Sequence, residues 1–318
     1  MSRNPHQRLP DPVIDRALAR AAALKGRSAG ILAIGVGHKH RRKTGYGKVA
    51  RVAIKFTVRS KRTRVSKKDR IPRWFQIEHR GRSYRIPTDV EPIGTLRRNL
   101  LGPCQVRNGA AVGYQGTAGP LLRASNGKRY LLTAGHVLFD DQDNNPWGAN
   151  DLPVFLNGAR IGTGVAAATY FEANGMRVDV GLIRLDDGVP PELQGPPWTA
   201  FTRIATEADL FAMSRTGGDT IGLQLYGWVS SPLATFDELN QTGIPVDKDT
   251  YAPFLIKARA QVGLFQAGDS GACVARQDGV LVGLHVLATT ADDTVGWSLA
   301  LPSLLTYLEG RTNLKFTL

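Results

Sequence analysis

The feature that most constrains the fold is a succession of short apolar segments that begins near residue 101. Gly, Asp and Asn residues separate each segment from the next. Short apolar runs between turn residues are typical of the strands of an all-β sandwich or barrel. We therefore expect a mainly β unit over residues 101–318, with a helix over 302–311. The segments are GAAVGYQG, GPLLRAS, RYLLTAGHVLF, LPVFLNGARIGTGVAAATYF, VDVGLIRL, DTIGLQLYGWVS, FLIKARAQV, ACVARQDGVLVGLHVLA and TVGWSLAL.

The charge of the chain divides it into two parts. Residues 1–100 hold 26 Lys and Arg against 6 Asp and Glu, whereas the other 218 residues hold 15 against 21. The first part therefore carries +20 and the second −6, which together give the net charge of +14. A chain of 318 residues also exceeds one small domain. Charge and length together predict two units, with a boundary near residues 97–103.

The first part begins with a predicted amphipathic helix over residues 11–25. Pro12 follows Asp11, as is common at helix starts, and Gly26 is a plausible stop. A set of apolar residues lies near one stripe of this helix, which favours a helix that docks on a neighbouring core. We assign residues 1–28 to an N-terminal helix and arm. The stripe consists of Val13, Leu18, Ala21 and Ala22.

Residues 29–100 are expected to form a small basic domain that is α/β or β-rich. Over residues 52–58, apolar Val, Ile, Phe and Val alternate with Ala, Lys and Thr, which is the period of a half-exposed strand. The segment WFQIEHRGRSYRIPTDVEPIG predicts a further strand pair. A Lys- and Arg-rich face would suit an acidic partner or effector, although it would also suit a solvated surface that complements the acidic second unit.

No segment of the sequence predicts a membrane span, a secretory leader or a metal site. The apolar runs are far shorter than the roughly 20 residues that cross a bilayer, and the N-terminus lacks an apolar signal core. Two cysteines, Cys104 and Cys273, form no disulfide framework. The segment GHKHRRK lacks acidic or thiolate ligands for a metal. We expect a cytoplasmic protein that uses neither metal nor cofactor.

Three polar residues of the β unit suit acyl transfer, which needs a nucleophile, a base and an orienting acid. His136 follows the apolar strand of YLLTAGHVLF. Asp179 is a lone acid within apolar VDVGLIRL, where burial would require a hydrogen-bond partner. Ser270 lies in the glycine-rich QAGDSGACV. Each also has a structural interpretation, as a buried histidine, a satisfied core carboxylate and a turn serine.

The order and spacing of these motifs resemble the chymotrypsin-like (trypsin-like) serine peptidases. His136 precedes Asp179 by 43 residues and Asp179 precedes Ser270 by 91, against about 45 and about 93 in the chymotrypsin template. The matching strings are TAGHV, DVGLIRL and GDSG, and the resemblance covers roughly residues 101–305. It implies two packed six-stranded antiparallel β-barrels, with the three residues in the cleft between them.

The resemblance also implies a role for each residue. His136 would be the general base and then the general acid, Asp179 would orient the imidazole, and Ser270 would attack the scissile carbonyl. The N–H groups of Gly268 and Ser270 would form the oxyanion hole. Cys273, two residues after the motif glycine, is expected to be a buried apolar side chain rather than a second nucleophile.

The resemblance further implies where a substrate would lie. Leu264 and Phe265 would line the primary pocket and offer no carboxylate to a basic side chain. The segment LVGLHV is similar to the pocket segment of bacterial glutamate-specific endopeptidases, which would make His285 a residue that selects Glu or Asp. A core histidine or an apolar pocket that accepts Leu or Phe fits equally well. After Val286, Leu287 and Ala288 would pair with the substrate, which adds a strand there.

These observations favour an intracellular serine endopeptidase that cleaves a protein or peptide. Residues 29–98 resemble the leader domain of some bacterial trypsin-like peptidases, so the basic domain could gate activity. Two other hypotheses remain: a catalytically idle module whose basic domain binds nucleic acid or another acidic partner, and a latent peptidase that needs an effector.

Overall fold

The structure is a computed structural model of the 318-residue chain. It describes residues 9–25, 31–39, 51–58, 66, 70–92, 96–98, 105–108, 115–138, 152–156, 158–168, 178–189, 201–215, 222–226, 234–240, 245–246, 249–250, 255–260, 268–289 and 295–318.

One sheet of the described chain has eight strands, all paired antiparallel. Its order is β22-β8-β9-β12-β11-β10-β6-β7. The last strand of the chain therefore closes one edge by pairing with β8. The strands are β6 (Gln105–Asn108), β7 (Gln115–Thr117), β8 (Leu121–Ala124), β9 (Arg129–Thr133), β10 (Leu152–Leu156), β11 (Ala159–Ala168), β12 (Val180–Leu185) and β22 (Phe316–Thr317).

A second sheet has twelve strands and includes strands from both ends of the chain. Its main path runs β14-β19-β20-β21-β18-β15-β1-β2-β4-β3, and β13 and β5 pair with β20. Strands β16 (Pro245–Val246) and β17 (Asp249–Thr250) form a separate pair. The twelve are β1 (Ile31–Lys39), β2 (Arg51–Val58), β3 (Trp74–His79), β4 (Arg82–Pro92), β5 (Leu96–Arg98), β13 (Arg203–Ile204), β14 (Gly222–Tyr226), β15 (Ala234–Asn240), β18 (Leu255–Ala260), β19 (Cys273–Arg276), β20 (Val280–Thr289) and β21 (Val295–Ala300).

The predicted mainly β class is confirmed, whereas two closed six-stranded barrels stay a prediction. Strand β14 pairs with β15 as well as β19, so six strands of the larger sheet are joined in a circuit of pairings. In the eight-stranded sheet, no pairing between described residues joins β22 to β7. The predicted domain boundaries also stay a prediction. Strand pairing crosses them, since β1 pairs with β15 and β5 pairs with β20.

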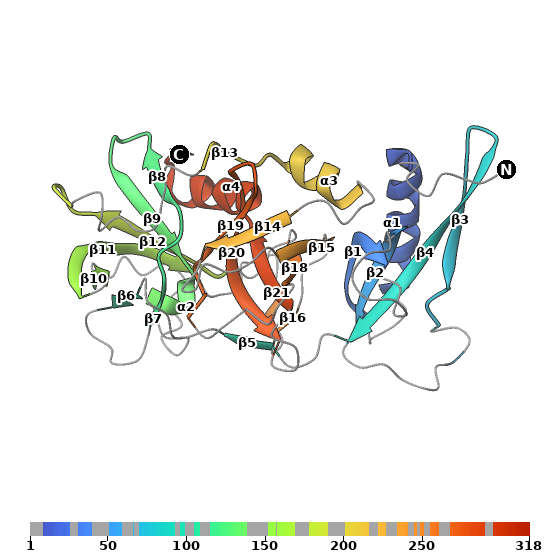
Figure 1. The fold of residues 1–318 in the computed structure, drawn as a ribbon, viewed down its shortest axis with the longest axis horizontal. Helices are drawn as coiled ribbons and strands as arrows, with labels where there is room; N and C mark the ends of the chain where they lie inside the picture. The colour runs from blue at the N-terminus through green and yellow to red at the C-terminus, as the bar shows by residue number, and fades with distance from the viewer. Residues whose placement is uncertain are drawn as a thin grey trace.

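Helix α1 (Asp11–Lys25) and strands β1 to β4 form a layer at one end of the molecule (Figure 1). The predicted bounds of this helix are confirmed, but its buried stripe differs from the predicted one. Ile14 and Ala17 are buried together with Val13 and Ala21, whereas Ala22 is exposed. The reason is the helical period, since positions 14, 17 and 21 share one face of a helix with 3.6 residues per turn. The helix also donates side-chain hydrogen bonds from Arg16 and Arg20 to carbonyl oxygens of β3.

The prediction that residues 52–58 form a half-exposed strand is wrong. Ala53, Lys55 and Thr57 are as buried as the apolar residues that alternate with them. Strand β2 lies between β1 and β4. Helix α3 (Glu207–Arg215) contacts β1 of this layer and β15, the neighbour of β1 in the sheet. The buried ammonium of Lys55 is satisfied by the carboxylates of Asp89 and Glu91 on β4, each at 3.0 Å. Burying Lys55 therefore depends on charges that the alternation pattern does not reveal.

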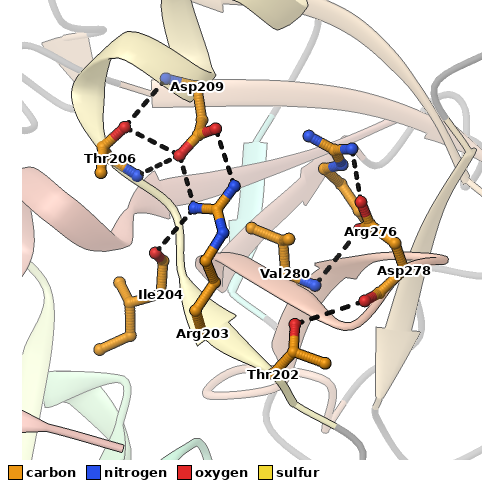
Figure 2. Close-up of polar contacts among 8 residues, drawn as sticks. All are labelled: Thr202, Arg203, Ile204, Thr206, Asp209, Arg276, Asp278 and Val280. Atoms are coloured by element: carbon orange, nitrogen blue, oxygen red, sulfur yellow. Dashed lines mark hydrogen bonds and ion pairs between the residues drawn. The ribbon is translucent and has the colours of Figure 1, made fainter.

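Helix α3 is anchored to the larger sheet by a polar cluster beside β13 and β20 (Figure 2). Thr206 and Asp209 cap the first turn reciprocally: the Thr206 N–H donates to the Asp209 carboxylate at 2.7 Å, and the Asp209 N–H donates to Thr206 Oγ1 at 3.2 Å. This is a capping box with Asp in place of the usual Glu or Gln. Arg203 on β13 grips the same carboxylate through both Nη atoms. These hydrogen bonds, above all those from Arg203, hold the pKa of Asp209 well below its ordinary value.

Three apolar clusters hold the described elements together. The largest joins the eight-stranded sheet to β19, β20 and β21, with α4 (Leu301–Thr312) packed against it. A second lies between α3 and strands β14, β19 and β20, and a third lies between α1 and strands β1 to β4. The predicted terminal helix over 302–311 is confirmed as α4. None of the described helices has the length and hydrophobicity needed to span a bilayer.

Candidate active site

His136 lies in a single helical turn, α2 (Gly135–Leu138), directly after β9. The turn packs into the main core through Val137 and Leu138, so the imidazole is held by buried neighbours and is itself 2% exposed. Its backbone N–H donates to Asp179 Oδ1 at 3.0 Å, and its Nδ1 lies 2.6 Å from Asp179 Oδ2. Main chain and ring of His136 are thus both fixed by one carboxylate.

Asp179 lies immediately before β12, not inside the strand as the sequence suggested. It is 2% exposed, and a carboxylate at that depth is costly unless it is hydrogen-bonded. The two contacts with His136 supply those hydrogen bonds. The hydrogen-bond partner that burial of this lone acid requires is therefore His136.

Ser270 completes the line of contacts, because its Oγ lies 2.9 Å from His136 Nε2. Its hydroxyl also lies 3.4 Å from the carbonyl oxygen of Val286. The three side chains come from the start of α2, the residue before β12 and the turn before β19, and all three are buried. Residues 134 positions apart in the chain are thereby brought into hydrogen-bond contact.

Main-chain hydrogen bonds fix the turn that carries Ser270. The Ser270 carbonyl accepts from the Thr117 N–H, the Gly271 N–H donates to the His285 carbonyl, and the Ala272 N–H donates to the Asp269 carbonyl, each at 2.8 Å. Gly271 has φ +95°, and a Cβ there would lie 2.2 Å from the Thr117 carbonyl oxygen. The second glycine of GDSG is therefore required by both conformation and space.

Two threonines that the sequence reasoning missed connect this turn to the eight-stranded sheet. Thr117 Oγ1 donates to the Gly268 carbonyl at 2.6 Å, and Thr133 Oγ1 donates to the Thr117 carbonyl at 2.9 Å. Both threonines are fully buried. A hydroxyl in an apolar strand end needs a partner, which is the signal that could have drawn attention to GTAG and LLTAG.

Gly268 has φ +103°, a region of conformation that favours glycine. A Cβ is therefore disfavoured at this position. The role of its N–H and that of Ser270 in an oxyanion hole stays a prediction.

The predicted pocket residues are only partly covered by the described chain. Leu264 and Phe265 lie outside the described residues. His285 and Val286 are fully buried on β20, and Leu287 and Ala288 continue that strand. Burial, and secondarily the nearby His136, lowers the pKa of His285 to about 3. The imidazole of His285 is therefore neutral at ordinary pH.

Cys273 is buried in the main core and forms no disulfide, in keeping with the expectation of a buried apolar side chain, and Cys104 lies outside the described residues. Within the described ranges, no group of three or more His, Cys, Asp or Glu side chains is arranged to hold a metal ion.

The arrangement can move one proton from the Ser270 hydroxyl to His136, while Asp179 orients the ring. When Nδ1 of His136 carries the proton and donates it in a hydrogen bond to Asp179, Nε2 carries a lone pair that faces the Ser270 hydroxyl. The carboxylate fixes this tautomer and would stabilise the imidazolium that forms when the ring takes the serine proton.

Comparison with solved structures finds similar folds among serine proteases. The Nocardiopsis protease aligns with a TM-score of 0.44 and 14% identity, over 68% of this chain and 98% of that protein. An inactive form of the Rv3671c protease of M. tuberculosis aligns with 0.41 and 17%, over 65% and 86%. Cellulomonas bogoriensis chymotrypsin aligns with 0.38 and 15%, over 68% and 97%.

At the sequence level, no family model and no curated protein matches the chain. The structural likeness is loose, with TM-scores below 0.5. Any assignment of function therefore depends on the contacts within this chain.

Proposed function

We propose that this chain is a serine endopeptidase of the chymotrypsin type. The single observation that supports it most is the unbroken line of contacts from Asp179 to His136 to Ser270, at 2.6 and 2.9 Å. Three separate structural roles would not require these side chains to meet in that order. The alternative of a catalytically idle module that binds nucleic acid is less favoured for the same reason.

The proposed reaction begins with the transfer of the Ser270 proton to His136. Ser270 Oγ attacks the carbonyl carbon of the scissile amide while its proton passes to His136 Nε2. The imidazolium then gives that proton to the departing amine, and the C–N bond breaks to leave an acyl-enzyme ester on Ser270. Water attacks the ester with His136 again as base, which releases the carboxylic acid and restores the hydroxyl.

The neutral state of His285 bears on which bond would be cut. A fully buried imidazole whose pKa is lowered to about 3 offers no positive charge to a substrate carboxylate. Of the two preferences that the sequence leaves open, we therefore propose apolar side chains such as Leu or Phe ahead of Glu or Asp. A cytoplasmic location, a bacterial source and an acidic partner for the basic N-terminal region remain predictions.

A fluorophosphonate probe tests the nucleophile, because it reacts with an activated serine without needing a peptide subsite. We expect the wild-type protein to be labelled, Ser270→Ala to be unlabelled, and Ser303→Ala, which alters a serine of α4, to be labelled like the wild type. A digest of a proteome-derived peptide library by wild type and Ser270→Ala then reports the preferred side chain. Equal labelling of wild type and Ser270→Ala would remove the proposal.

A further inference from the structure

The edge of β20 next to Ser270 is the place where a substrate strand would pair. The carbonyl of Val286 lies 3.4 Å from Ser270 Oγ. Between His285 and Leu287 the pairing with β21 shifts register, which makes Val286 the extra residue of a bulge, a feature common beside active sites. A peptide that brings a carbonyl to Ser270 and extends along β20 therefore meets Leu287 and the residues after it.

That length of β20 is already paired with a strand of the same chain. Strand β5 runs antiparallel to it, with Arg98 opposite Leu287, Arg97 opposite Ala288 and Leu96 opposite Thr289. Two of these partners, Leu287 and Ala288, are the residues that the sequence assigned to substrate pairing.

The register also fixes the edge on which β5 lies. Leu284 pairs with β21 on one side and with Cys273 of β19 on the other. Leu287 pairs with β21 on one side and with Arg98 on the other. Because a strand has two edges, β19 and β5 share the edge of β20 that faces away from β21.

Strands β5 and β19 also run in the same direction along this edge, since both are antiparallel to β20. Ser270 lies between them, three residues before Cys273 begins β19 and beside Val286. The chain in β5 therefore runs toward the Ser270 hydroxyl. The acyl part of a peptide substrate is the part N-terminal to the scissile bond. When that part pairs with this edge, the substrate chain also runs toward the nucleophile and reaches it at the scissile carbonyl.

We propose that β5, residues 96–98, is an intramolecular substrate mimic that occupies the substrate-pairing edge of β20 and holds the proposed peptidase in an autoinhibited state. This inference rests on the proposed function, because the edge of β20 binds substrate only if Ser270 is the nucleophile. It identifies the inhibitor as the segment that joins the basic N-terminal region to the β unit. Movement of that region would withdraw the strand.

The first experiment compares two double variants that differ only in the main chain. Arg97→Pro/Arg98→Pro removes the main-chain N–H of both residues, and therefore any ladder hydrogen bond that either donates to β20, whereas Arg97→Ala/Arg98→Ala removes the same charges and keeps both N–H groups. A strand tethered to its own site has an effective concentration on the order of 1 mM. With a dissociation constant of about 0.1 mM, it raises the apparent KM for a competing substrate about tenfold. We expect the Pro variant to lower the apparent KM for a peptide substrate by about that factor, with kcat unchanged, and the Ala variant to stay close to the wild type.

Labelling by the fluorophosphonate separates failure of this inference from failure of the proposed function. Equal KM values for the Pro and Ala variants, with both proteins labelled at Ser270, would overturn the autoinhibitory strand and leave the peptidase standing. If the wild-type protein is not labelled, the proposed function itself is overturned.

A second variant tests the same strand if the prolines prevent folding. Leu96 and Thr289 are directly opposed, and opposed residues of an antiparallel pair have Cα atoms about 4.5–5.5 Å apart, within disulfide range. In Leu96→Cys/Thr289→Cys with Cys104→Ser, oxidation should lower peptide hydrolysis by about tenfold or more, as a locked occupant requires. Reduction should restore hydrolysis, and fluorophosphonate labelling should change little. Failure of the pair to oxidise, or unchanged hydrolysis after it has oxidised, would contradict the proposal.

Discussion

At the scale of the residue, the site depends on polar groups that are buried and satisfied by one another. Asp179 is acceptable at 2% exposure because both of its oxygens contact His136. His285 lies in the same buried region and is kept neutral by its surroundings. The two histidines of the β unit thus differ in kind: one is prepared for proton transfer by a carboxylate, and the other is held uncharged by burial.

Replacing Asp179 by Asn tests the proposed role of the carboxylate. The amide keeps the size of the side chain but no longer favours the tautomer with a free Nε2, and the analogous change in the chymotrypsin template lowers kcat about 10⁴-fold. We expect a loss of similar order in peptide hydrolysis. Asp187→Asn, a change at an exposed residue paired with Lys128, should keep the wild-type rate, and equal rates for the two variants would argue against the role.

The lowered pKa of His285 predicts a pH dependence of stability. The unfolded chain protonates this histidine near its ordinary pKa of 6.5, whereas the folded chain resists protonation down to about 3. The unfolded state therefore binds more protons between these values, and the free energy of unfolding falls by up to about 1.4 kcal/mol for each pH unit below 6.5. Urea unfolding from pH 7 to pH 4 should show a shallower decline for His285→Gln than for the wild type. Parallel declines would contradict the assignment.

At the scale of the element, the turn from residue 268 to residue 272 is the part of the site that tolerates least change. It is bound to β7 through Thr117 and to β20 through His285, and its glycines have positive φ. The strands on either side supply rigid edges, so the position of Ser270 is set by two sheets at once. Substitutions in this turn should therefore cost stability as well as activity.

Gly271→Ala measures how tightly that turn is packed. Its matched control is Gly127→Ala, because Gly127 also has positive φ but a Cβ there would meet nothing within 4 Å. The control should cost about 1 kcal/mol of unfolding free energy from conformation alone. Gly271→Ala should cost about 3 kcal/mol or more, since the new methyl group would displace the Thr117 and Thr133 contacts as well. Denaturant titration gives both values, and equal costs would contradict the crowding.

At the scale of the whole molecule, the strands of the basic N-terminal layer are part of the larger sheet in the described chain. Strand β1 pairs with β15, helix α3 contacts both strands, and β5 reaches back to β20. Figure 1 shows the N-terminal layer at one end of the molecule and the eight-stranded sheet at the other, with the rest of the larger sheet between them. The N-terminal region is thereby connected to the edge of β20 beside Ser270.

This continuity predicts that the chain unfolds as one unit. Phe56→Ala, in the cluster around α1, and Leu182→Ala, in the main core, should each lower the temperature of a single calorimetric transition, because each removes about 2–5 kcal/mol of core packing. Two separate transitions, with Phe56→Ala moving only the first, would show instead that the N-terminal layer is an independent domain.

The sequence by itself determined the features that are encoded locally. Alternating and apolar runs marked most strands, and Pro12 and Gly26 marked the two ends of α1. The order of TAGHV, DVGLIRL and GDSG singled out the three residues that come into contact. These signals are local because strand propensity, turn chemistry and the cost of a buried lone acid are properties of short segments.

Only the tertiary structure decided which segments become neighbours. The burial of Lys55 depends on two carboxylates of a strand more than 30 residues away, and the roles of Thr117 and Thr133 depend on a turn that the chain reaches much later. The pairing of residues 96–98 with β20 had no local signal, because LRR carries neither the alternation nor the length of a strand. Such contacts depend on the relative placement of distant backbones, and no short window of sequence contains that information.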